Sequence, residues 1–201
     1  MKIPRQYDGN LLTDADAGML LTRAQFRDAE PEPRFRLERV ASRLVVSDQF
    51  DLQHHTTLEP LRDQLGLFRV RSPTVMEHVF QSSWTAIDEE TDRIADLAVF
   101  LTQTTARKKP FPHWVPDIVF EIVSAGWENR RRDYQEKRDE YERIGVREYV
   151  IVDRFDHLVT VLTLTDGHYV QQCLGPNDSY TSPQLPQLPG LTIPLQEVIG
   201  A

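Results

Sequence analysis

The stretch that most constrains the fold is a run of strand-forming residues from Pro116 to Val123. Side chains in a strand alternate between its two faces, so every second residue from Ile118 falls on one face, and Val119, Glu121 and Val123 fall on the other. A strand that is apolar on both faces is typical of the centre of a covered sheet. An unpaired charge at Glu121 would cost several kcal/mol or shift its pKa. Glu121 therefore needs a cation, a proton or a metal.

The helix predicted after this strand carries a similar anomaly. One stripe of a 3.6-residue period contains Tyr134, Lys137, Tyr141 and Ile144. Lys137 thus lies on the inward face of a helix over residues 133–144. Gly145 predicts the helix end, and residues 149–152 form a second apolar strand, which gives a strand, helix and strand with a parallel crossover. Lys137 and Glu121 can therefore meet.

A second isolated carboxylate, Asp96, lies inside the apolar strand predicted over residues 93–100. Asp117 and Glu121 share a strand face but are separated by about 13 Å at ~3.3 Å per residue, so they cannot bind one ion together. Asp96 is therefore the partner that we expect for Glu121. Two carboxylates, the backbone carbonyl of Ile122 and waters would make an oxygen-rich site suited to Mg²⁺ or Mn²⁺.

Such a site supports hydrolysis of a phosphodiester bond. A metal lowers the pKa of water and neutralises developing charge, and Lys137 would orient the nucleophile or stabilise the phosphorane. The structural alternative is a buried ion pair between Glu121 and Lys137, with Asp117 at a strand end. A buried pair adds little stability over apolar residues, so we favour a functional role.

Length and composition indicate one domain over residues 1–201, with an N-terminal arm over 1–21 and a core over about 22–199. The chain has 201 residues, of which 40% are hydrophobic and 27% charged. It has neither an apolar run of membrane length nor the apolar region of a secretory signal. We therefore expect a cytoplasmic protein without a membrane partner. The single Cys173 excludes an internal disulfide and a cysteine-rich zinc site.

The net charge of −8 counts against a protein whose whole surface contacts nucleic acid. Two basic triplets flank the central strand, namely Arg107, Lys108 and Lys109, and Arg130, Arg131 and Arg132. They are candidate DNA contacts, although a run of charges is as often a solvated face.

The remaining elements predict a mixed α/β (α+β) fold. The expected elements are a helix over 22–28, a hairpin of strands over 34–40 and 43–46, a helix over 56–65 ending at Gly66, strands over 67–70, 75–87, 158–165 and 168–174, an extended segment over 183–194 and a helical turn over 195–199. Whether the second helix reaches back through His54 and His55 is open, because Pro60 would then kink it. Either histidine is a functional candidate, with a surface histidine as the commoner alternative.

Several motifs together resemble a known family. They are Pro116 to Val123, the arginines before Asp133, Glu136-Lys137-Arg138, Tyr141, Gly145 to Tyr149, Val152-Asp153, Ala95-Asp96-Leu97, Ser182-Pro183 and Leu188 to Leu191. This set resembles the Uma family of restriction-endonuclease-like proteins and covers most of the chain from about Leu21.

The resemblance implies the PD-(D/E)XK nuclease fold, with a mixed central sheet flanked by helices, an extra N-terminal hairpin and C-terminal strands. It assigns the two metal-binding acids to Asp96 and Glu121. Val123 stands at the usual lysine position, and the resemblance moves the basic role to Lys137, with Tyr141 as its companion. It also implies a Mg²⁺-dependent DNA endonuclease.

Three departures leave an alternative open. The family carries a glutamate in its first hairpin, roughly at Arg36, an Asp-Gly turn roughly at Ala41-Ser42, and a proline at Ala95. The alternative is a weak or inactive nuclease-fold protein that binds DNA or a protein. A homodimer formed through the terminal strands is compatible with both hypotheses.

Overall fold

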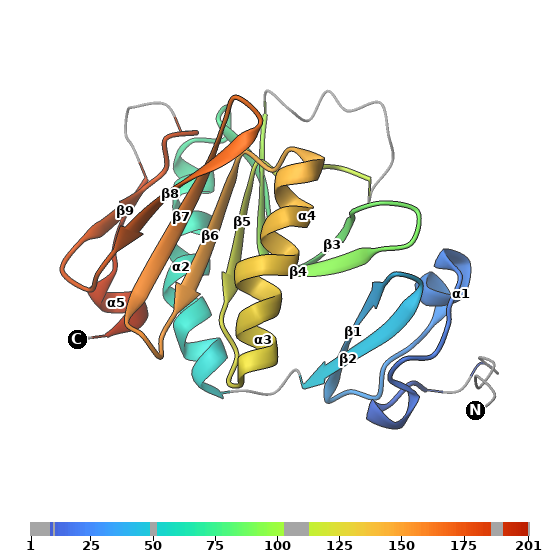
Figure 1. The fold of residues 1–201 in the computed structure, drawn as a ribbon. Coiled ribbons are helices and arrows are strands. Elements are labelled where there is room, and N and C mark those ends of the chain that lie inside the picture. The colour runs from blue at the N-terminus through green and yellow to red at the C-terminus, as the bar shows by residue number, and fades with distance from the viewer. Residues whose placement is uncertain (1–8, 10, 49–51, 103–112, 186–190, 201) are drawn as a thin grey trace.

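A mixed eight-stranded sheet carries helices on both faces in the computed structural model, which describes residues 9, 11–48, 52–102, 113–185 and 191–200 (Figure 1). The strands of this sheet are β1 (Phe35–Val40), β2 (Arg43–Asp48), β3 (Met76–Ala86), β4 (Asp92–Leu101), β5 (Ile118–Ile122), β6 (Glu148–Asp153), β7 (Leu158–Thr165) and β8 (His168–Leu174). A separate two-stranded sheet contains β9 (Ser179–Thr181) and β10 (Thr192–Pro194). The helices are α1 (Arg23–Asp28), α2 (Leu52–Arg71), α3 (Trp127–Arg131), α4 (Lys137–Ile144) and α5 (Gln196–Ile199), with a 3₁₀ turn at Asp14–Asp16 and a π-helical turn at Arg132–Glu136.

The predicted parallel crossover is confirmed. Strands β5 and β6 pair in parallel from Ile118↔Glu148 to Ile122↔Val152, and the helical segment between them packs on one face of the sheet (Figure 1). Gly145 ends α4 with φ 85°, a left-handed conformation that glycine adopts at little cost. The mixed sheet with flanking helices, the N-terminal hairpin and the late strands agree with the predicted fold class.

Strand β4 changes its partner part-way along its length. One edge of β4 pairs with β3 over most of the strand. The other edge pairs with β5 at Leu97–Val99 and with β1 at Asp92, which lies opposite Arg39. Because a strand has only two edges, β1 and β5 must diverge between these two contacts. Asp96 lies next to this divergence.

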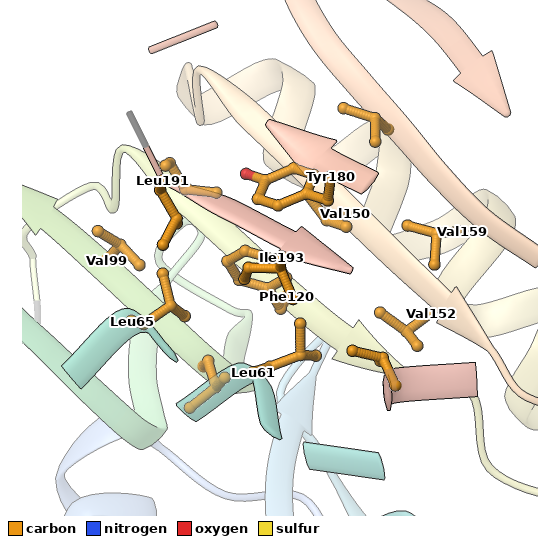
Figure 2. Packing of buried hydrophobic residues seen from close by; sticks show 14 of the residues in the cluster. Leu61, Leu65, Val99, Phe120, Val150, Val152, Val159, Tyr180, Leu191 and Ile193 are labelled. Atoms are coloured by element: carbon orange, nitrogen blue, oxygen red, sulfur yellow. The ribbon is translucent and has the colours of Figure 1, made fainter. Parts of the chain in front are cut away.

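The core confirms which face of β5 each residue occupies. Phe120 packs in one layer with Leu61 and Leu65 of α2, as Figure 2 shows. Val119 packs in the other layer with Tyr141 of α4. Each layer is closed by apolar residues from neighbouring strands, so β5 is covered on both sides.

The prediction for α2 was wrong in its extent. The helix does not end at Gly66, and residues 67–70 are helical rather than a strand. Leu61, Leu65 and Phe68 form one continuous buried stripe, and this tertiary packing outweighs the low helix propensity of glycine. The helix also extends N-terminally past Pro60 and includes His54.

One further prediction needs correction. The segment containing Arg130, Arg131 and Arg132 is helical from Trp127 onward, so the helical segment begins before the predicted residue 133. The extended segment over 183–194 contributes β10, which pairs with β9. No helix in the described ranges combines the length and apolar character needed to cross a membrane.

Candidate active site

Asp96 is the residue of β4 next to Leu97, where the pairing with β5 ends. Its carboxylate, instead of a backbone carbonyl of β4, accepts the hydrogen bond from the next backbone N–H of β5. Its Oδ2 accepts a 2.8 Å hydrogen bond from the backbone N–H of Ile122 and lies 3.0 Å from Nε2 of His54. Its Oδ1 accepts a 2.6 Å hydrogen bond from Nη2 of Arg36. Asp96 is therefore held in place by three elements, β5, α2 and β1.

Glu121 lies next to Asp96 on the neighbouring strand. The last paired residues of β4 and β5 are Leu97 and Phe120, so the same antiparallel register places Asp96 opposite Glu121. Oε2 of Glu121 lies 2.9 Å from Nζ of Lys137, and Oε1 accepts a 2.9 Å hydrogen bond from the Tyr141 hydroxyl. The predicted meeting of the strand acid and the helix base is confirmed.

These side chains line a cavity of about 680 Å³ between the N-terminal hairpin and the segment after β5. The lining comes from β1, β2, α2, β4, the end of β5 and the helical segment from Glu128 to Lys137. Asp96, Glu121 and Lys137 are only 1–2% exposed although they border the cavity. The acidic and basic groups thus lie at the buried end of a polar space.

The analysis of the sequence missed Glu38, the carboxylate that β1 contributes to this cluster. Glu38 is 3% exposed, and its Oε1 lies 3.5 Å from Nζ of Lys137. Its carboxylate also accepts hydrogen bonds from Arg93 at 3.1 Å and from the backbone N–H of Ile94 at 3.0 Å. The first hairpin therefore does supply an acid. This acid lies two residues beyond Arg36, which is the position that the resemblance had indicated.

Asp133 was also missed as a member of the cluster. It lies in the π-helical turn, and its Oδ1 is 3.7 Å from Nζ of Lys137, one helical turn away. Turns of this type occur often at functional sites. The charge pattern of the helix alone did not distinguish Asp133 from a solvated acid.

Burial and the crowding of acids determine the ionisation of the cluster. Burial raises the pKa of Glu121 to about 8, and Asp96, Asp133 and Glu38 add to this rise, whereas Lys137 opposes it. Burial also acts to raise the pKa of Glu38, but the positive charges of Lys137, Arg93 and Arg132 outweigh burial and lower this pKa to about 2. For Asp96, burial is outweighed by Arg36 and His54, which hold its pKa well below the usual range.

The basic and phenolic groups stay protonated. Burial alone would lower the pKa of Lys137, but the surrounding carboxylates, first among them Glu121, raise it. Burial and the charge of Glu121 raise the pKa of Tyr141 well above its ordinary value. Lys137 therefore carries its charge, and Tyr141 remains a hydrogen-bond donor.

The other predicted residues lie at different distances from the cavity. His54 lines it, whereas Asp117 accepts a hydrogen bond from the backbone N–H of Leu101 and lies 3.8 Å from Arg147, at the far end of β5. The backbone N–H of Ile122 donates to Asp96, and a role for the Ile122 carbonyl stays a prediction. Lys108 and Lys109 lie outside the described residues.

The arginine triplet is engaged by local carboxylates. Arg130 contacts Asp153 at 3.0 Å and also pairs with Asp156. Arg131 contacts Glu136 at 2.8 Å, and both Arg131 and Arg132 line the cavity. Arg131 and Arg132 are thus the members of the triplet at the cavity.

The donor chemistry of the cluster fits a divalent cation. Within the described ranges, no three His, Cys, Asp or Glu side chains are grouped as a ready-made metal site. The carboxylates of Asp96 and Glu121 nevertheless offer the oxygen ligands that Mg²⁺ and Mn²⁺ prefer. Oδ1 of Asp133 is buried without a hydrogen-bond partner. Burial, more than the neighbouring acids, raises the pKa of Glu121, and a dication bound by its carboxylate would favour the ionised form.

Comparison with known proteins bears on the fold and the family of the chain. The chain is similar to a crystal structure from Anabaena variabilis, described as "a putative nuclease belonging to DUF820", with 13% sequence identity and a TM-score of 0.67 over 89% of this chain and 97% of that one. At this identity the similarity shows the fold alone. No curated protein matches the sequence. The profile of the Uma2 family, described as "Putative restriction endonuclease", matches residues 23–196. The chain therefore belongs to the Uma2 family of restriction-endonuclease-like proteins.

Proposed function

We propose that this protein is a divalent-metal-dependent endonuclease that hydrolyses phosphodiester bonds in DNA. The observation that supports the proposal most strongly is the convergence of Asp96, Glu121 and Lys137 at one cavity. Two carboxylates on adjacent strands and a charged lysine on the crossover helix are the groups that this reaction requires. Family membership supports the same reaction class.

Each residue then has a separate role. Asp96 and Glu121 would hold Mg²⁺ or Mn²⁺, which when bound supplies positive charge for the phosphate and acidifies water. Lys137 would donate hydrogen bonds to the attacking water or to a phosphate oxygen as negative charge develops there. Tyr141 fixes Glu121 through its 2.9 Å hydrogen bond and so limits the carboxylate to one orientation. His54 fixes Asp96 in the same manner.

The substrate would enter past Arg131 and Arg132. Both line the cavity, and Arg131 is half exposed, so its guanidinium can contact a phosphate at the expense of its exposed pair with Glu136. The net charge of −8 makes contact over a broad protein surface unfavourable. Recognition should therefore be concentrated at the cavity.

Cleavage assays with the full chain test this proposal. Duplex, single-stranded and branched DNA should be incubated with Mg²⁺, Mn²⁺ or a chelator. Cleavage should require the metal and should be lost in Asp96→Asn and in Glu121→Ala, and both variants should remain folded. Asp63→Asn, which changes an exposed carboxylate on α2, is the matched control and should cleave normally. A parent protein that cleaves none of these substrates would contradict the proposal.

One observation favours a second function, a nuclease-fold protein that binds DNA or a protein without cleaving. Arg36 neutralises Asp96 directly through the 2.6 Å contact. In this case the parent should bind one of the DNA substrates with the same affinity in the presence of a metal or a chelator, and should leave it intact.

A further inference from the structure

Arg36 makes the shortest charged contact to the candidate metal ligands. Its Nη2 lies 2.6 Å from Oδ1 of Asp96, and its Nη1 donates a weak 3.5 Å hydrogen bond to the carbonyl of Ile94. The side chain is 20% exposed and the Asp96 side chain 2% exposed. The pair is therefore largely shielded from water. A charge-assisted hydrogen bond is strong in such a shielded environment.

Arg36 competes for one particular oxygen. Oδ2 of Asp96 already accepts from Ile122 and faces His54, so Oδ1 is the oxygen that points toward Arg36. A carboxylate oxygen cannot bind a guanidinium and a dication at the same position without strong repulsion between the two cations. Binding of one must weaken binding of the other.

We propose that Arg36 acts as an internal counter-ion that competes with a divalent cation for Asp96 and thereby lowers the metal affinity of the site. Arg36 is thus a positioning residue: its guanidinium holds Asp96 in place until a divalent cation displaces the guanidinium. The inference rests on the proposed function, because it concerns the same metal ligands. It adds a residue that neither the family membership nor the reaction itself requires.

Binding of Mn²⁺ alone to the full chain tests the inference without reference to activity. Calorimetric titration or the electron paramagnetic resonance signal of free Mn²⁺ gives the affinity. Arg36→Gln should bind Mn²⁺ roughly tenfold or more tightly than the parent, because a positive charge beside the ligand is removed. Arg36→Lys should stay close to the parent. Arg62→Gln removes an exposed arginine on α2 and should change nothing. Arg36→Met, which keeps the aliphatic stem, is the second variant if Arg36→Gln does not fold.

The outcomes separate the inference from the proposed function. Unchanged or weaker Mn²⁺ binding in a folded Arg36→Gln or Arg36→Met protein overturns the inference, whether or not the parent cleaves DNA. Tighter binding that disappears when Asp96→Asn is added supports it. If the variant binds Mn²⁺ and the parent neither binds it nor cleaves, the inference stands and the proposed function of the natural chain fails. If neither protein binds Mn²⁺, both fail.

Discussion

Nζ of Lys137 lies 2.9 Å from Oε2 of Glu121, and both side chains are 2% exposed. The same ammonium lies 3.5 Å from Glu38 and 3.7 Å from Asp133, so one cation is shared by three carboxylates. Removing Lys137 therefore leaves three acids without this partner, whereas removing Glu121 leaves Lys137 with two.

Lys137→Met should lower the rate of DNA cleavage by orders of magnitude. The methionine keeps the aliphatic stem but cannot donate hydrogen bonds to the water or the phosphate. Affinity for Mn²⁺ should be unchanged or higher, because a positive charge near the ligands is lost, and DNA binding should change little. Single-turnover cleavage together with Mn²⁺ titration would measure these effects. A cleavage rate equal to that of the parent would remove Lys137 from the mechanism.

Lys137→Met should also destabilise the fold more than Glu121→Gln does. Breaking a buried pair by removing its shared cation costs about 3–5 kcal/mol. Glutamine at position 121 keeps an oxygen that accepts from Tyr141, so its cost should be nearer 1–3 kcal/mol. Urea unfolding at pH 7 measures both values. The reverse order of the two costs would show that Glu121, and not Lys137, is the centre of the charge network.

The sequence predicted the central unit and its inward charges because both depend on local periodicity. A period of two assigned the faces of β5, and a period of 3.6 assigned Lys137 to the inner face of its helix. The covering layers and the contact between Lys137 and Glu121 agree with these assignments. Their catalytic roles remain predictions.

Glu38 could not be found in this way because its burial depends on a long-range contact. Strand β1 meets β4 through Arg39 and Asp92, which are 53 residues apart in the sequence. Alternation within β1 shows only that Glu38 and Arg36 share a face, and such a face is equally consistent with solvent. The extent of α2 was missed for a related reason, since its packing surface comes from distant strands.

The turn of the first hairpin offers a stabilising substitution. Ala41 and Ser42 have φ angles of 48° and 62°, a conformation that costs L-residues about 1–2 kcal/mol each and that Asn-Gly adopts readily. Ala41→Asn combined with Ser42→Gly should raise the free energy of unfolding by about 1 kcal/mol, as measured by urea denaturation. Ser47→Gly, within β2, is the control and should lower it, because glycine weakens a strand. A loss of stability in the double variant would contradict this account of the turn.

A buried acid on the opposite side of the sheet gives the clearest expectation for pH. Glu148 of β6 is fully buried and accepts hydrogen bonds from the hydroxyls of Tyr180 and Ser182, so it joins the C-terminal segment to the large sheet. No described basic side chain forms an ion pair with it. Tyr180 in turn packs edge-on against Phe120, with 5.4 Å between ring centroids, in the layer shown in Figure 2. Ionisation of Glu148 thus places an unpaired charge beside the core.

Glu148→Gln should therefore become more stable relative to the parent as the pH rises. Burial raises the pKa of Glu148 from 4.5 to about 7, with the hydroxyls of Ser182 and Tyr180 opposing the rise. A raised pKa in the folded state gives stability that is complete below pH 4.5 and is lost as the pH rises through about 7. Glutamine does not titrate, so the unfolding free energy of the variant minus that of the parent should increase by up to roughly 3 kcal/mol between pH 4.5 and 8. Urea unfolding across this range measures it, with the exposed Glu59→Gln as the control for net charge. A constant difference would show that Glu148 remains solvated or is neutralised by a cation.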